Sequence, residues 1–227
     1  MSSPGLARRL AAEALGTALL LAIVIGSGIL GERLSGGNDA LALLANSIAT
    51  GAGLVVLILI FGPISGAHFN PAVTLVFVLR KEHGVRDGLA YAAAQTMGAL
   101  AGVAAAHAMF ALPIVELSAK HRDGPALAFS EVVATFGLVA TILGSMRARP
   151  DSVPVNVGLY ITAAYWFTSS TSFANPAVTV ARALSNTFAG IAWTSAPLFI
   201  VCQFAGAALA VPVFGWLLRD RGPAQGV

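Results

Sequence analysis

The pentapeptide Asn-Pro-Ala-Val-Thr occurs twice in this chain, at residues 70–74 and at residues 175–179. Asparagine is a strong N-cap residue, because its side chain can accept a hydrogen bond from a backbone N–H group of the first helical turn. Proline suits the first helical position, where its missing N–H group would have no partner inside the helix. Each copy therefore predicts a helix that begins at its asparagine, and any fold for this chain must accommodate both helix starts.

Both copies lie in the sequence of a membrane protein. Of the 227 residues, 57% are hydrophobic and only 10% are charged, whereas soluble domains average about 25% charged residues. A helix that spans a bilayer needs about 20 mostly apolar residues. Six stretches meet that requirement, and they cover residues 10–31, 40–62, 87–112, 127–147, 153–169 and 194–218. We therefore expect an all-α membrane protein with six transmembrane helices.

The two segments that begin at the repeated pentapeptide, residues 70–80 and 175–185, are too short to span a membrane. About ten residues at ~1.5 Å each cover half of a roughly 30 Å hydrocarbon core. We expect each to be a half-helix that follows a non-helical, re-entrant leg, at residues 62–69 and 168–174 respectively. Non-helical backbone at membrane depth is tolerated only where it is buried in protein or lines a wet cavity. Both pentapeptides should therefore lie inside the protein and not against lipid.

The two halves of the sequence repeat each other around the pentapeptides. Glu13 corresponds to Glu131, and Gln95 corresponds to Gln203, with similar residues around each pair. The chain is thus expected to be one membrane domain, residues 1–227. It contains two repeats, residues 10–112 and residues 127–218. Each repeat has three spans and one half-helix. An odd number of spans inverts the second repeat, and inverted repeats place the functional site near the membrane midplane, at the repeat interface.

Inversion brings the two half-helices in from opposite faces, so that their N-termini meet near the centre of the membrane. Each N-terminus carries about half a positive charge from the helix dipole, and the asparagine amides add N–H donors there. A cation or a proton meets a positive potential at this point, whereas a polar neutral molecule can accept hydrogen bonds. The sequence predicts a pore that is lined here by Asn70, Pro71, Ala72, Asn175, Pro176 and Ala177.

Lysine and arginine residues predict the orientation, because they are enriched in cytoplasmic loops. With six spans, both termini lie on the same side of the membrane. Nine of the 13 basic residues fall on that side, namely Arg8, Arg9, Arg80, Lys81, Arg86, Arg147, Arg149, Arg219 and Arg221. The other four are Arg33, Lys120, Arg122 and Arg182. We therefore expect both termini to be cytoplasmic.

With these features the chain resembles the major intrinsic protein family, the aquaporins and aquaglyceroporins. The sequence "SGAHFNPAVT" is similar to a signature of that family, and the resemblance extends from Glu13 to the last span. It implies a right-handed bundle of six tilted spans and two half-helices, which usually assembles as a homotetramer with one pore per subunit. By the same resemblance, Glu13 and Glu131 would brace the re-entrant legs by accepting backbone N–H bonds. We expect the membrane to be a bacterial inner (plasma) membrane.

One position departs from the family pattern. The family typically has arginine three residues after the second asparagine, where it narrows the outer constriction and repels cations, whereas this chain has Val178. Val178 could open the filter to larger or less water-like neutral solutes. Alternatively, Arg182 could supply the charge from one helical turn further on, since residues i and i+4 share a helix face. Because that turn displaces the Cα by about 6 Å, we expect Arg182 at the outer mouth and favour the open filter.

The other positions of the filter follow by spacing within the resemblance. They are Thr50 on the second span, Ser172 on the second re-entrant leg, and either Tyr165 or Ala163 on the fifth span. Together with Val178 they form a wide, weakly polar gate, which disfavours a pore for water alone. Family members with such departures pass glycerol, urea or neutral metalloid hydroxides such as arsenite. The aspartate that usually follows the second motif in glycerol channels is absent, so the sequence does not identify which of these solutes passes.

Functions from different classes fit these features. The first is a passive channel for water and small uncharged solutes, of which a water-selective aquaporin is the narrower form. The second is a secondary transporter, but its candidate coupling residues, Glu13 and Glu131, are better explained as loop braces. The third is a structural membrane protein with a closed pore. No nucleophile–base set, metal cluster or phosphate loop is present, so we expect no enzyme and no cofactor or metal. The scattered basic residues indicate no nucleic-acid partner.

Overall fold

The computed structural model describes residues 4–219, and within that range the chain is helical without any strand. The helices are α1 (Leu6–Leu34), α2 (Asp39–Ser65), α3 (Pro71–Leu79), α4 (Val85–Met109), α5 (Pro125–Ala148), α6 (Val153–Phe167), α7 (Pro176–Arg182) and α8 (Ala196–Leu217), with a 3-10 turn η1 (Pro150–Ser152) before α6. Among these described elements α1, α2, α4, α5 and α8 are long and apolar enough to cross a membrane. The sixth span is α6, which has 15 residues and is two residues shorter than expected. Arg221, one of the basic residues counted above, lies outside the described residues.

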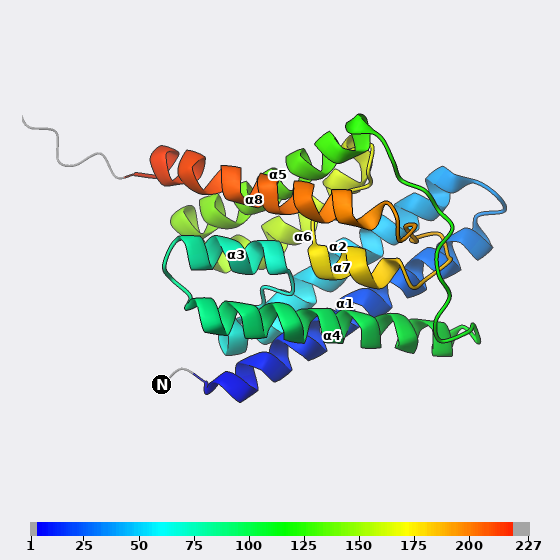
Figure 1. The fold of residues 1–227 in the computed structure, drawn as a ribbon, viewed down its shortest axis with the longest axis horizontal. Helices are drawn as coiled ribbons and strands as arrows, with labels where there is room; N and C mark the ends of the chain where they lie inside the picture. The colour runs from blue at the N-terminus through cyan, green and yellow to red at the C-terminus, as the bar shows by residue number, and fades with distance from the viewer. Residues whose placement is uncertain (1–3, 220–227) are drawn as a thin grey trace, which may run out of the picture.

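The helices form two sets that pack against each other. Helix α1 packs on α2 and α4, helix α5 packs on α6 and α8, and the α2–α6 contact joins the two sets. The short helices α3 and α7 lie roughly end to end between α8 and α4 (Figure 1). The described residues therefore form six spans and two half-helices, and the contacts of α5 with α6 and α8 repeat those of α1 with α2 and α4.

Glycine residues allow the long helices to approach at their backbones. A Cβ atom at Gly98 of α4 would overlap the carbonyl oxygen of Ala14 in α1, and a Cβ atom at Gly102 would overlap that of Ala18. In the second set, a Cβ atom at Gly206 of α8 would meet backbone of α5 in the same way. Without a hydrophobic driving force between helices in lipid, small residues that permit such close packing stabilise the contact.

The first re-entrant leg is shorter than the sequence indicated. Residues 62–65 were expected to be non-helical, but α2 continues through Ser65 with Pro63 inside it. Pro63 has no N–H group to donate to the Leu59 carbonyl, a loss that interrupts helices in water but that transmembrane helices tolerate. The helix ends instead at Gly66, whose φ of 90° is left-handed and whose N–H group donates to the Gly62 carbonyl. Glycine adopts this conformation without the penalty of a Cβ atom.

The second half-helix is also shorter than expected, because α7 ends at Arg182 and not near residue 185. The backbone beyond it pairs with the loop that joins α4 to α5, residues 110–124. The N–H group of Ser118 donates to Ala183 O at 3.0 Å, and the N–H group of Glu116 donates to Leu184 O at 3.1 Å. These bonds replace the helical ones and hold the 110–124 loop over one end of the bundle.

Candidate functional site

The two pentapeptides meet through their asparagines. Asn70 Oδ1 accepts a bond from Ala72 N at 2.9 Å and Asn175 Oδ1 accepts one from Ala177 N at 3.0 Å, so each asparagine caps its own half-helix. The amide nitrogens cross to the other repeat: Asn70 Nδ2 donates to Ala174 O at 2.7 Å, and Asn175 Nδ2 donates to Phe69 O at 2.8 Å. An amide NH₂ group has two donors. One is used in each crossing bond, and one is left to face the cavity that both asparagines line.

Glu13 is buried beside the first re-entrant leg and accepts four hydrogen bonds. Its carboxylate receives the N–H groups of His68 at 3.0 Å and Phe69 at 2.7 Å. The Ser65 hydroxyl and the Gln95 amide donate at 2.6 and 2.8 Å. A buried carboxylate is costly unless it is hydrogen-bonded in this way. The four donors compensate that cost and fix the position of the leg.

Glu131 has the same role in the second repeat. Its carboxylate receives the N–H groups of Phe173 at 3.0 Å and Ala174 at 2.9 Å, and the amide of Gln203 at 2.6 Å. Glu13 and Glu131 are both 0% exposed. Each carboxylate binds the N–H group of a residue with left-handed backbone. Glu13 binds Phe69, whose φ is 50°, and Glu131 binds Ala174, whose φ is 49°. Such backbone costs about 1–3 kcal/mol per residue, so the carboxylates stabilise legs that are strained at matching positions.

The residues expected to form the filter lie on one cavity. This main cavity has a volume of about 550 Å³, and its walls include Thr50, Tyr165, Ser172 and Val178. The Thr50 and Tyr165 hydroxyl oxygens are 3.3 Å apart. Ala163, the alternative to Tyr165, is exposed on another face of α6 and does not line the cavity. Ser172 Oγ is buried without a hydrogen-bond partner among the described residues, so this donor is free for a molecule in the cavity.

Arg182 lies deeper than the outer mouth where we expected it. It is 2% exposed and lines both the main cavity and a second cavity, of about 240 Å³, which we call the outer cavity. Its guanidinium carbon is 3.4 Å from the centroid of the Phe173 ring, and its Nε donates to Ala189 O. Arg182 lies one helical turn beyond Val178 along α7, and the two side chains share a helix face. The four-residue spacing in the sequence was the feature that indicated this shared face.

Two further basic residues, Lys120 and Arg122, line the outer cavity from the 110–124 loop. The sequence contains no pattern that connects this loop with the pore. The position of the loop depends on its contacts with the chain after α7. Ala192 N donates to Lys120 O at 2.6 Å, and Arg122 N donates to Ser195 Oγ at 3.1 Å. Among residues 4–219, no group of three or more His, Cys, Asp or Glu side chains is placed to hold a metal ion.

Comparisons with known proteins agree on one family. A family model described as "Major intrinsic protein" matches residues 1–214. The chain is 57% identical over 218 residues to aquaglyceroporin AqpS of Rhizobium meliloti (strain 1021), with 96% of this chain and 93% of that protein covered. It is 30% identical over 227 residues to aquaporin-1 of Homo sapiens, with 94% and 83% covered.

A solved structure has the same fold. The aquaglyceroporin from Plasmodium falciparum superposes with a TM-score of 0.72 at 19% identity, and 94% of this chain and 99% of that chain are covered. At this identity the likeness concerns the arrangement of the helices alone. It agrees with the six spans and two half-helices described above.

Proposed function

Because this chain belongs to the major intrinsic protein family, we propose that it is a passive channel for water and larger uncharged solutes. The solute class is glycerol, urea or a neutral metalloid hydroxide such as arsenite. The observation that carries this proposal is Val178 on the wall of the main cavity, at the position where the family typically has arginine. A relative with 57% identity is itself named an aquaglyceroporin.

The centre of the pore would conduct neutral molecules and repel cations. The N-termini of α3 and α7 meet where Asn70 and Asn175 cross, and each helix end contributes about half a positive charge. The free amide donors of the two asparagines can bond a solute oxygen in place of the water that it loses. A cation has no matching acceptor set at that point, and half-helix ends of this kind exclude protons and cations. The two Asn-Pro-Ala triplets are thus proposed as the pore centre, in which Asn70 and Asn175 line the main cavity. The other four residues, Pro71, Ala72, Pro176 and Ala177, are buried behind them and are not among its walls.

The filter would be wide and weakly polar. Thr50, Tyr165 and Ser172 bring three hydroxyl groups to the wall of the main cavity, and Val178 adds an apolar surface. A solute with several hydroxyl groups can bond Ser172 Oγ, which has no partner among the described residues, while its carbon skeleton contacts Val178. A water-selective aquaporin is the alternative, and it would require Arg182 to narrow the conduit from its position beyond Val178.

Val178→Arg is expected to lower glycerol permeability by about tenfold or more, a barrier increase of about 1.4 kcal/mol or more, while water still passes. The new guanidinium would fill the space that the valine leaves open in the main cavity. Stopped-flow light scattering on liposomes with the purified protein measures both fluxes. Val178→Thr, which has nearly the same volume, is the control and should keep glycerol flux. Native liposomes that pass water but neither glycerol, urea nor arsenite would contradict the wide filter.

Arg182→Gln is expected to raise the proton leak of the same liposomes by at least tenfold. A unit charge that acts over ~8 Å at an effective dielectric constant of ~20 opposes a passing cation by about 2 kcal/mol. Glutamine can keep a donor toward Ala189 O, which limits the structural effect of the change. A pH-sensitive dye inside the liposomes reports the leak. If the leak stays at the native level, the half-helix ends alone exclude protons.

A secondary transporter would need an ionisable residue that changes protonation or ion binding during transport. Glu13 and Glu131 are the buried carboxylates of the spans, and every bond they accept comes from a re-entrant leg or from a glutamine and serine that support it. Neither lines the main cavity. Their contacts therefore support a bracing role and favour the channel over the transporter.

We further propose the assembly and the orientation. The chain would form a single channel domain, 1–227, from the repeats 10–112 and 127–218, and four copies would associate as in the family. Exposed leucines on several helices, such as Leu15, Leu159 and Leu209, suit contact with lipid or with another copy. Both termini would face the cytoplasm of a bacterial cell from its plasma membrane, because the basic residues are concentrated on that side.

A further inference from the structure

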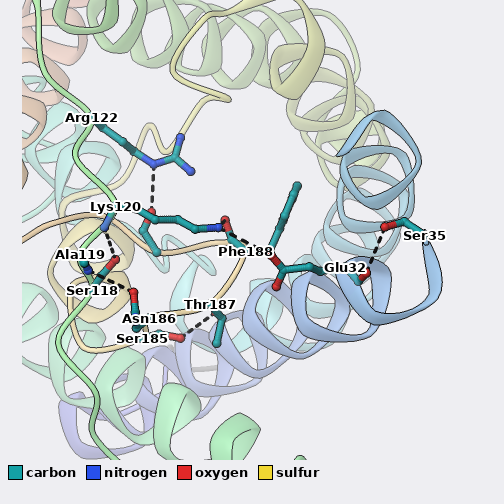
Figure 2. Close-up of polar contacts among 11 residues, drawn as sticks. Glu32, Ser35, Ser118, Ala119, Lys120, Arg122, Ser185, Asn186, Thr187 and Phe188 are labelled. Carbon is teal, nitrogen blue, oxygen red and sulfur yellow. Dashed lines mark hydrogen bonds and ion pairs between the residues drawn. The ribbon is translucent and has the colours of Figure 1, made fainter. Parts of the chain in front are cut away.

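The outer cavity is lined by residues from the end of α1, the start of α2 and the 110–124 loop. These segments lie at the end of the bundle opposite both ends of the described chain (Figure 1). The walls of the outer cavity include Glu32, Asp39, Lys120, Arg122, Arg182 and Phe188. Its volume of about 240 Å³ is several times the ~30 Å³ that one water molecule occupies in the liquid. Figure 2 shows Arg122 projecting from the 110–124 loop beside Lys120, which reaches toward Phe188 and Glu32. Three cationic side chains thus surround a space large enough for a small ion.

The two arginines have no carboxylate partner among the described residues. Arg122 Nε donates to Gly190 O at 2.9 Å, and its Nη1 approaches Ser170 O at 3.5 Å. Arg182 bonds through Nε alone, to Ala189 O. Backbone carbonyls hold the guanidinium groups in place, but they do not neutralise the charge. A guanidinium has five N–H donors, so both Nη groups of Arg182 and one of Arg122 are left without a protein acceptor.

The same aromatic ring fixes both guanidinium groups. The guanidinium carbon of Arg182 is 3.4 Å from the centroid of Phe173, and that of Arg122 is 5.1 Å from it. Two like charges that share one ring repel each other, and the ring offers only a weak attraction in return. A buried cation without an anionic partner is costly.

The acidic residues of the outer cavity do not compensate these charges. Glu32 Oε1 is 3.9 Å from Lys120 Nζ, and its side chain is 51% exposed at the rim. Asp39 is exposed in the first turn of α2 and makes no ion pair within the described residues. Burial lowers the pKa of Lys120, which Glu32 only partly offsets, and burial also lowers the pKa of Arg122. Because Glu32 and Asp39 are both exposed, the inner walls of the cavity hold Arg122 and Arg182 without a buried acidic residue among them.

We propose that the outer cavity is a binding site for a small oxyanion, a carboxylate or a phosphate, held between Arg122 and Arg182 with Lys120 at the entrance. The fixed fork of a guanidinium matches two oxygens of such a group, and charge-assisted bonds of this type are short and strong. This site goes beyond conduction of neutral solutes, because its ligand is charged. Since Arg182 also lines the main cavity, a bound anion would lie over the conduit and slow solutes that enter from this side.

A simpler role for the three cations is to repel other cations, and the test must separate the two. The probe is acetate, observed through its methyl group by saturation-transfer difference NMR with the purified channel in a nonionic detergent. Tetramethylammonium, a cation with methyl groups, is measured in parallel, and sodium chloride keeps the ionic strength constant. We expect a saturable acetate signal that inorganic phosphate displaces, and no saturable signal from tetramethylammonium. Transport is not measured, so the result is independent of which neutral solute the channel conducts.

Arg122→Gln should weaken acetate binding by about tenfold or more, because it removes a charged donor. Lys120→Gln should weaken it as well and serves if the first variant does not fold. Arg86→Gln is the matched control: Arg86 is an exposed arginine at the start of α4, at the other end of the bundle, and its loss should leave binding unchanged. The proposal is overturned if acetate gives no saturable signal, if phosphate fails to displace it, or if Arg122→Gln and Arg86→Gln bind acetate equally.

Discussion

Gly98→Ala is expected to prevent assembly of a stable channel. The added Cβ atom would overlap the carbonyl oxygen of Ala14 in α1, and backbone cannot move aside as a flexible side chain can. Overpacking in a core costs about 1–3 kcal/mol when side chains can adjust, and here α1 and α4 would have to separate along their whole contact. Separation would shift Glu13 on α1 and Gln95 on α4, which share a hydrogen bond at the first re-entrant leg. The change should therefore remove stability and permeability together.

Fluorescence-detected size-exclusion chromatography after heating measures this loss. Gly144→Ala in α5 is the matched control, since a Cβ atom there meets nothing within 4 Å. That variant should be neutral or more stable, because alanine in a helix interior gains about 0.5–1 kcal/mol over glycine. If Gly98→Ala elutes as the native protein does and keeps its water permeability, the close α1–α4 approach is not required for the fold.

Glu131→Ala is expected to destabilise the second re-entrant leg by about 2–6 kcal/mol, since two buried N–H groups lose their acceptor at about 1–3 kcal/mol each. These are the N–H groups of Phe173 and Ala174, and Gln203 loses its acceptor as well. Without the carboxylate, the left-handed residue Ala174 loses the acceptor of its N–H group, and the bond that its carbonyl accepts from Asn70 remains. The N-terminus of α7 would no longer be held at the pore centre, so both water and glycerol flux should fall steeply.

Two further variants serve as a graded change and as a control for Glu131→Ala. Glu131→Gln keeps one carbonyl oxygen and should cost about half as much, because a single N–H group then faces an amide donor. Glu116→Ala removes a partly exposed carboxylate that accepts a hydrogen bond from the Asn186 amide at 3.3 Å, and it should be close to native in both assays. Thermal stability and stopped-flow permeability are measured on the same preparations. Native-like flux in Glu131→Ala would mean that the leg is held by its other contacts.

Local and repeated signals predicted the parts of the pore that depend on them. The Asn-Pro pairs are capping signals, and α3 and α7 begin directly after Asn70 and Asn175. The predicted end of α2 at residue 62 was wrong, because the helix continues through Pro63 to Ser65 and ends at the left-handed Gly66. These differences concern single turns of helix, whose ends depend on which tertiary partner the backbone groups find.

The outer part of the pore could not be predicted in the same way. The four-residue spacing from Val178 to Arg182 indicates a shared helix face, but it does not tell how far a cavity extends along that face. Arg122 belongs to the 110–124 loop. Its position depends on contacts such as the hydrogen bond to Gly190 O, which is 68 residues away in the sequence. Such contacts have no period or motif, so the meeting of Arg122 and Arg182 at the outer cavity becomes visible only in three dimensions.

The crossing bonds of the two asparagines also constrain how the channel is made. Until Asn175 has been synthesised and inserted, Phe69 O lacks the donor that it has in the finished protein, and Asn70 Nδ2 lacks Ala174 O. The first half of the nascent chain must therefore wait in the bilayer with an incomplete re-entrant leg, and water must supply the missing bonds. Completion of the pore is then a late step of biogenesis, in which each half acts as the template for the other and an unfinished chain has no pore centre to leak through.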